Sequence, residues 1–178
     1  MHSTLFALSY FGRCVTATSW FLSAAWKVVH PREFSLAYGR ITSHNLPLPA
    51  SAAWCLAVIE VTAGAFLLLP AAPRIVAVTV SLALLALMTL TLGRARDLAA
   101  GCGCWRMPTQ EQPRRVYVVR NSILMAFALS GLPQGTVYPA LVILGLAAGG
   151  IVSLALMYLP EIRSVWLAGR KLVEVREL

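Results

Sequence analysis

Long apolar blocks that carry almost no charge are the feature of this sequence that most constrains its fold. Five such blocks lie at about residues 5–29, 52–69, 75–92, 116–132 and 137–159. A helix needs roughly 17–25 mainly apolar residues to cross a bilayer. Prolines and glycines mark several block ends: Pro70, Pro73, Gly131, Pro133 and Pro160. The chain is 58% hydrophobic and 12% charged, whereas soluble domains carry roughly 25% charged residues. We therefore predict an all-α integral membrane protein, with one bundle of about five transmembrane helices over residues 1–160.

The first block admits a second interpretation, a cleaved signal peptide. Arg13 interrupts this block and Lys27 lies near its end. No Lys or Arg precedes the apolar stretch, however, and a signal peptide requires such a charged segment. We interpret the block as a membrane helix.

The distribution of Lys and Arg predicts the orientation, because cationic loops are retained on the cytoplasmic side. Thirteen of the 15 cationic residues fall at the end of the first block or in the loop after it, between the third block and the start of the fourth, or in the tail. Arg74 alone lies on the opposite side, and Arg13 lies within the membrane. The N-terminus is therefore predicted outside and the tail inside. The net charge of +8 then belongs to loops beside the lipid bilayer, and no nucleic-acid partner is expected.

The tail, residues 161–178, is basic and amphipathic. Its apolar residues recur at roughly helical spacing among charges: Ile162, Val165, Trp166, Leu172 and Val173. This pattern suits a helix lying among the lipid headgroups, or a solvated tail with some helix.

A step of small residues occurs in the last apolar block, where Gly145 and Gly149 form a GxxxG pair. Such pairs let a second helix approach closely. The partner helix belongs either to the same bundle or to another protomer.

The cysteines Cys102 and Cys104, separated by one glycine, form the segment with the clearest chemistry. Two thiols at this spacing can close into a small disulfide ring, and strained, accessible disulfides tend to be exchangeable. Three guanidinium groups flank the pair, those of Arg94, Arg96 and Arg106. Nearby cations favour the thiolate, the form that attacks in exchange. We interpret the segment as a redox pair with these arginines tuning the thiolate.

Two other interpretations of this segment stay open. The thiols are structural in one of them, as loop cysteines or a permanent disulfide. In the other, they bind a metal, with His30 and His44 completing a Cys₂His₂ set or with Cu(I) held by the thiolates alone. The spacing matches no zinc signature, and no metal site is predicted. Cys14 and Cys55 lie inside apolar blocks, where cysteine usually behaves as a small hydrophobic residue; a relay of disulfides to the loop pair is the alternative.

Several polar residues fall inside or at the ends of the predicted helices. Glu60 lies among apolar residues in mid-helix, and a carboxylate there must face the bundle interior and find a partner. We expect Arg13 to be that partner. Lys27 is expected to extend its ammonium to the membrane interface. Arg120 and Asn121 open the fourth helix, where Arg120 holds the cysteine loop or anchors the helix among headgroups.

Taken in chain order, these residues form a pattern. It begins with an Arg within the first helix and a Lys that closes it, here Arg13 and Lys27. An F-x-x-x-Y element and prolines follow, here Phe34, Tyr38, Pro47 and Pro49. An E-L-x-x-G element in the second helix corresponds to residues 60–64, with Val in place of Leu.

Two more elements complete the pattern: a C-G-C segment, here Cys102 to Cys104, and an R-N pair, here Arg120 and Asn121. In this order the elements resemble the methylamine-utilisation MauE group within the wider DoxX-like membrane proteins, over roughly residues 10–130. That family usually has Phe-Gly after the second Cys, whereas this chain has Trp105-Arg106.

The resemblance implies a four-helix core like that of DoxX-like proteins, in the bacterial inner (plasma) membrane. It further implies a role in disulfide formation or in maturation of a redox enzyme, with a thioredoxin-like protein or that enzyme as partner. DsbB-type and vitamin K epoxide reductase membrane oxidoreductases work by a similar logic and pass electrons to quinone. A quinone is thus a candidate cofactor, although no residue requires one.

Three functions follow as hypotheses. The first is a thiol-disulfide oxidoreductase in which Cys102 and Cys104 are catalytic. The second is a non-catalytic membrane subunit or assembly factor that docks a partner enzyme, within an oligomer or larger membrane complex. The third is a small transporter whose path Glu60 and Arg13 line.

The predicted orientation conflicts with the resemblance. The charge rule places the thiols on the cytoplasmic side, whereas the family's partners work outside. On orientation we follow the charges.

Overall fold

The fold is all-helical, as predicted. A computed structural model describes residues 2–41, 49–69, 74–94, 114–132, 139–158 and 166. Within these residues the chain forms six helices: α1 (His2–Val29), α2 (Pro31–Ile41), α3 (Ala50–Leu68), α4 (Arg74–Arg94), α5 (Arg114–Ser130) and α6 (Pro139–Met157). The C-G-C segment and, apart from Trp166, the predicted tail lie outside the described residues. The short helix α2 was not predicted, because its 11 residues are too few and too polar to register as an apolar block.

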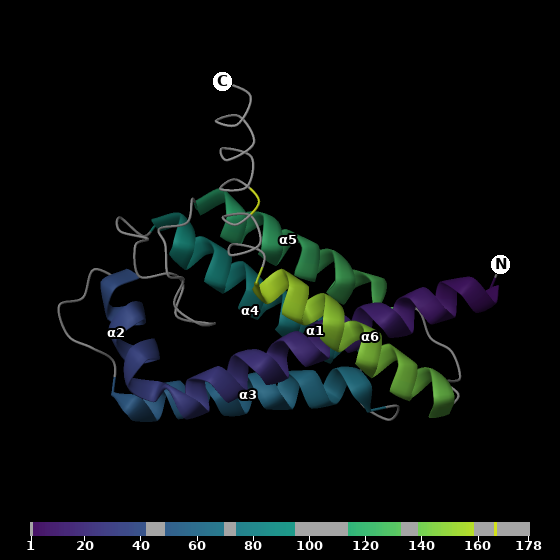
Figure 1. The fold of residues 1–178 in the computed structure, drawn as a ribbon, viewed down its shortest axis with the longest axis horizontal. Helices are drawn as coiled ribbons and strands as arrows, with labels where there is room; N and C mark the ends of the chain where they lie inside the picture. Colours follow the sequence, from purple (N-terminus) through teal and green to yellow (C-terminus); the bar gives the residue numbers. More distant parts are fainter. Residues whose placement is uncertain are drawn as a thin grey trace, which may run out of the picture.

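Helix α1 is the centre of the bundle (Figure 1). It packs against α3, α5 and α6, and α4 packs against α3 and α5. Helix α2 lies at one end of the bundle, on the left in Figure 1, where it contacts α3 and α4. The carboxyl end of α4 and the amino end of α5 lie toward this same end. The connection between α4 and α5 therefore starts and finishes at the end of the bundle that carries α2.

Two stretches are long and apolar enough to cross a membrane, Ala50–Leu68 and Ile75–Gly93, and Val142–Met157 is a shorter apolar helix. Their outward side chains are largely apolar; Val58, Ile143 and Ile151, for example, are between 63 and 72% exposed. Apolar surface of this kind is stable against lipid. The protein is an all-α integral membrane protein.

Helix α1 is polar for a membrane helix, and its position in the bundle explains why. Its 28 residues span about 42 Å, longer than the roughly 30 Å hydrocarbon core. Six polar side chains recur every three or four residues and are at most 4% exposed: Ser9, Arg13, Thr16, Ser19, Ser23 and Lys27. Because neighbouring helices cover α1, these groups face protein and not lipid. Hydropathy alone therefore underestimates how deeply α1 is embedded.

The GxxxG pair of α6 packs within the bundle, against α1. A Cβ atom added to Gly149 would lie 2.9 Å from the backbone carbonyl carbon of Cys14 and 2.9 Å from the amide nitrogen of Val15. One turn further on, Ser153 donates to the carbonyl oxygen of Val15 at 2.9 Å or to that of Gly149 at 2.7 Å. The hydroxyls of Thr18 and Ser19 lie 2.8 and 3.0 Å from the Ser153 hydroxyl. Because Gly145 and Gly149 lack side chains, the α6 backbone lies close enough to α1 for hydroxyl groups to form hydrogen bonds across the interface.

The Gly149→Ala variant is expected to destabilise the bundle by about 1–3 kcal/mol, since its methyl group must displace the α1 backbone. Gly150→Ala is the matched control, because a Cβ atom there meets nothing within 4 Å. Thermal unfolding of the two variants in detergent compares them. An equal loss of stability in both would contradict the close α1–α6 packing.

Candidate functional site

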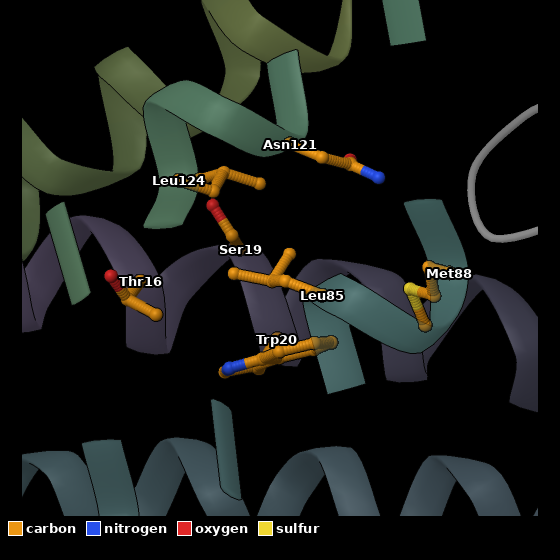
Figure 2. A pocket seen from close by; sticks show the side chains of 7 residues that line it. All are labelled: Thr16, Ser19, Trp20, Leu85, Met88, Asn121 and Leu124. Atoms are coloured by element: carbon orange, nitrogen blue, oxygen red, sulfur yellow. The ribbon is translucent and has the colours of Figure 1, made fainter. Parts of the chain in front are cut away.

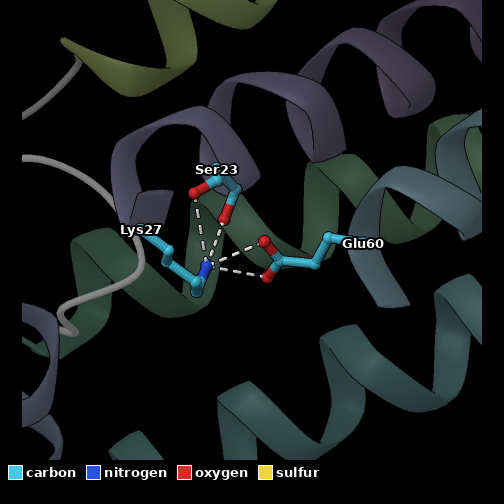
Figure 3. Close-up of polar contacts among 3 residues, drawn as sticks. All are labelled: Ser23, Lys27 and Glu60. Carbon is cyan, nitrogen blue, oxygen red and sulfur yellow. Dashed lines mark hydrogen bonds and ion pairs between the residues drawn. The ribbon is translucent and has the colours of Figure 1, made fainter. Parts of the chain in front are cut away.

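A buried ion pair joins α1 to α3. The Lys27 ammonium lies 2.8 Å from each carboxylate oxygen of Glu60, and both side chains are 0% exposed. Ser23, one turn before Lys27, adds its hydroxyl at 2.7 Å and its carbonyl oxygen at 3.5 Å as acceptors for the same ammonium. Figure 3 shows the three residues, with the ammonium between the serine and the carboxylate. The ammonium therefore exchanges its water shell for fixed oxygen atoms.

The local sequence explains how Glu60 reaches this position. Glu60 and Gly64 lie one turn apart on the buried face of α3. A Cβ atom on Gly64 would lie 2.9 Å from the Phe21 ring and 3.2 Å from the carbonyl oxygen of Ala17. The missing side chain lets α3 approach α1, and this approach brings the carboxylate within reach of Lys27.

Helix α2 covers the ion pair. Phe34 is 2% exposed, and its ring centroid lies 5.3 Å from the Lys27 ammonium, a cation–π distance. The opposite face of α2 exposes Arg32, Glu33 and Leu36. The short helix thus places an aromatic ring over the ion pair and turns its charged residues Arg32 and Glu33 outward.

Two expectations about this site are wrong. Lys27 does not extend to the interface, because the carboxylate and Ser23 hold it inside the bundle. The ion-pair partner of Glu60 is Lys27 and not Arg13, which lies 14 residues earlier on α1, roughly 21 Å away along the helix axis. Ser23 was missed in the sequence, although its place in the three-to-four-residue polar repeat of α1 is a signal for it.

Arg13 occupies a different part of the bundle, where α1 meets the carboxyl end of α5. It is 3% exposed, and its guanidinium carbon lies 4.9 Å from the Tyr10 ring centroid. A Cβ atom on Gly131 would lie 2.7 Å from the Arg13 side chain. Gly131 therefore makes room for the arginine, which lies apart from the ion pair of Lys27 and Glu60.

Arg120 and Asn121 lie inside the bundle and link α5 to α4. Arg120 is 3% and Asn121 1% exposed. The Asn121 side-chain oxygen accepts from the Arg120 guanidinium at 3.2 and 3.4 Å, and its amide donates to the Thr89 hydroxyl at 3.0 Å. The Tyr117 ring lies 5.6 Å from the guanidinium carbon of Arg120. This network fixes α5 against α4 near the ends that flank the C-G-C connection.

A small pocket lies between α1, α4 and α5 (Figure 2). Its lining comprises Thr16, Ser19, Trp20, Leu85, Met88, Asn121 and Leu124. The free volume is about 10 Å³, roughly what one water molecule needs. Sites for organic ligands take about 300–1,000 Å³. The quinone suggested by the resemblance does not fit this pocket.

The structure describes two of the four cysteines. Cys14 is fully buried beneath Gly145 of α6, and Cys55 is exposed on α3; both are free thiols. Arg94 is the last residue of α4. Arg96, Cys102, Cys104, Arg106 and His44 lie outside the described residues. Among the residues that are described, no three His, Cys, Asp or Glu side chains gather into a group that could hold a metal ion. His30 stacks on Trp26 and lies 3.2 Å from a Glu33 oxygen.

Comparison with known protein families places the matched part of the chain in a family of methylamine utilisation proteins. The family described as methylamine utilisation protein MauE matches residues 5–134, which include the ion pair, the C-G-C segment and the Arg120-Asn121 pair. Helix α6 lies beyond the matched region. No curated protein and no solved structure matches the chain.

Removing one partner of the ion pair is expected to cost about 3–5 kcal/mol, because the other charge stays buried without compensation. Lys27→Met and Glu60→Gln should therefore lower the unfolding temperature strongly. The double variant Lys27→Met/Glu60→Leu should recover much of the loss, since no lone charge remains. Glu33→Gln removes the exposed carboxylate beside His30 and should have little effect. Single and double variants of equal stability would contradict the coupling.

Proposed function

The chain belongs to the MauE family of methylamine utilisation proteins, and from this membership we propose that it is a membrane thiol-disulfide oxidoreductase or disulfide-relay component. Family membership ties it to a redox enzyme system. In this proposal the chain helps methylamine dehydrogenase to mature, with a thioredoxin-like protein or the enzyme itself as partner. The observation that carries the proposal is the match over residues 5–134, because that region contains both Cys102 and Cys104.

The positions of the helix ends support this function. Helix α4 ends at Arg94 and α5 begins at Arg114, and both ends lie toward the end of the bundle that carries α2. The connection that contains the C-G-C segment is anchored at these two points. The Arg120–Asn121–Thr89 network and the buried ion pair hold the supporting helices in a fixed arrangement. A fixed support favours a thiol pair that meets a partner protein outside the membrane interior.

The proposed chemistry is an exchange. A thiolate of the partner attacks one sulfur of the Cys102–Cys104 disulfide and forms a mixed disulfide, and the partner's second thiol then displaces the bound cysteine. The partner's dithiol is oxidised to a disulfide, while Cys102 and Cys104 are reduced to two thiols. Cations from Arg94, Arg96 and Arg106 would stabilise the departing thiolate.

Orientation is part of the proposal. We propose that the five long helices cross the bacterial inner membrane, with the N-terminus outside and the tail inside. An odd number of crossings puts the two ends on opposite sides. The basic residues at the α2 end of the bundle, such as Arg32 and Arg115, then face the cytoplasm.

The second candidate function is a non-catalytic assembly factor or membrane subunit that docks a partner enzyme. The burial of Lys27 and Glu60 at 0% exposure favours it, because charges enclosed in this way order a bundle and meet no substrate. No contact among the described residues favours the transporter hypothesis, because Glu60 pairs with Lys27 and not with Arg13.

The redox proposal predicts that Cys102 and Cys104 interconvert between dithiol and disulfide. In membranes treated with oxidant or reductant, trapping free thiols with a mass-shifting reagent should show two forms that differ by two reagent adducts. A Cys102→Ser/Cys104→Ser variant should lose both the shift and the ability to support enzyme maturation. The control variant Cys14→Ser/Cys55→Ser should keep both. Maturation that survives the loss of Cys102 and Cys104 would leave the assembly-factor function.

The orientation predicts protection of Cys104 from a membrane-impermeant thiol reagent in intact cells. The test uses a chain in which Cys104 is the single cysteine, beside a control with Arg74→Cys as the single cysteine. Labelling of Cys104 should require permeabilised cells, whereas the residue 74 control should label directly. Direct labelling of Cys104 would reverse the orientation and place the thiols on the exported side.

A further inference from the structure

Three buried polar side chains line the pocket between α1, α4 and α5. Thr16 and Asn121 are 1% exposed and Ser19 is 4% exposed. They belong to α1 and α5, whereas the remaining lining residues are apolar or aromatic: Trp20, Leu85, Met88 and Leu124. Figure 2 shows these side chains arriving from three helices. The site therefore has three polar groups and is otherwise lined by apolar or aromatic side chains.

Each of the three polar side chains can form a further hydrogen bond. Thr16 donates its hydroxyl hydrogen to the carbonyl oxygen of Gly12 at 2.9 Å, which leaves its oxygen lone pairs as acceptors. Ser19 donates to Ser153 at 3.0 Å and likewise retains acceptor capacity. The Asn121 amide carries two hydrogens, and in the described part of the chain one of them goes to Thr89 at 3.0 Å. Two acceptors and one donor thus belong to a single pocket.

Those groups match the needs of one water molecule. A buried water typically makes about three hydrogen bonds and needs at least 10–15 Å³, and the free volume here is about 10 Å³, the lower limit of that range. An apolar ligand would leave the amide hydrogen without an acceptor, which costs free energy in a buried site. An anion would face two hydroxyl oxygens whose hydrogens are already donated elsewhere.

We propose that this pocket is a binding site for a single internal water molecule shared by Thr16, Ser19 and Asn121. The water donates to the two hydroxyl oxygens and accepts from the amide. It continues a chain of hydrogen bonds that crosses the bundle, from Ser153 on α6 through Ser19 on α1 to Asn121 on α5 and Thr89 on α4. This site does not depend on the proposed thiol chemistry.

The position of Met88 in the lining gives a direct test. X-ray irradiation converts bound water into hydroxyl radicals, which oxidise a neighbouring methionine to its sulfoxide. In the full-length protein in lipid nanodiscs, Met88 should be oxidised severalfold faster than Met125, which is also partly buried and packs against the hydrophobic core. Equal rates in the wild-type protein would show that the pocket is dry and would overturn the proposal.

A matched pair of variants tests the ligands of the water. Thr16→Val keeps the side-chain shape and removes the hydroxyl. Thr62→Val removes an equivalent hydroxyl, which also donates to the carbonyl four residues earlier, at 2.8 Å, but which faces outward from α3. Thr16→Val should abolish the excess oxidation of Met88 and lower the unfolding temperature more than Thr62→Val. Undiminished oxidation of Met88 in Thr16→Val would place the water elsewhere and overturn the assignment.

Discussion

The structure depends on how the bundle accommodates charge in an apolar environment. Lys27 and Glu60 are enclosed completely, and an isolated charge at such a position would be costly. Three features offset that cost: a carboxylate that meets the ammonium through both oxygens, a serine hydroxyl one helical turn away, and the Phe34 ring on α2. The pair also specifies register, since sliding α1 along α3 by one turn would separate the charges. The ion pair requires the close approach of α1 and α3 that Gly64 allows, and α2 lies where its Phe34 ring covers the Lys27 ammonium.

Helix α1 forms the interior of the bundle because its neighbours approach it at residues without side chains. Gly64 of α3 and Gly149 of α6 meet the α1 side chains and backbone at distances that a Cβ atom would not allow. Close approach brings hydroxyl groups within bonding distance, as at Ser153. At these two contacts glycine and serine take the place of large apolar side chains, which elsewhere form a core that includes Trp20, Leu67 and Leu85. Close packing matters here because lipid offers no hydrophobic force to drive helices against each other.

The proposed redox function uses this rigid body as a support. Helices α4 and α5 are joined by Asn121 and Thr89, and their adjacent ends carry the connection that contains Cys102 and Cys104. A thiol pair on such a support would be held at the membrane surface, where its substrate would be another protein. The internal water proposed beside Asn121 would belong to the same network and contribute to its stability.

The sequence by itself determined that the chain lies in lipid, that it is helical and to which family it belongs. Long apolar blocks have few solutions other than membrane helices, because every backbone polar group must be satisfied within the segment, and the order of Arg13, Lys27, Glu60, C-G-C and Arg120-Asn121 was enough to identify the MauE pattern. Only the tertiary structure decided which charges meet. Arg13 and Lys27 are both cations on one helix, and either could serve Glu60 as far as composition shows; the choice depends on the axial offset of α1 and α3, which packing at Gly64 sets. Helix α2 and the enclosure of the ion pair could not be predicted from the sequence either. An 11-residue amphipathic segment has a buried face only because of the helices that it covers.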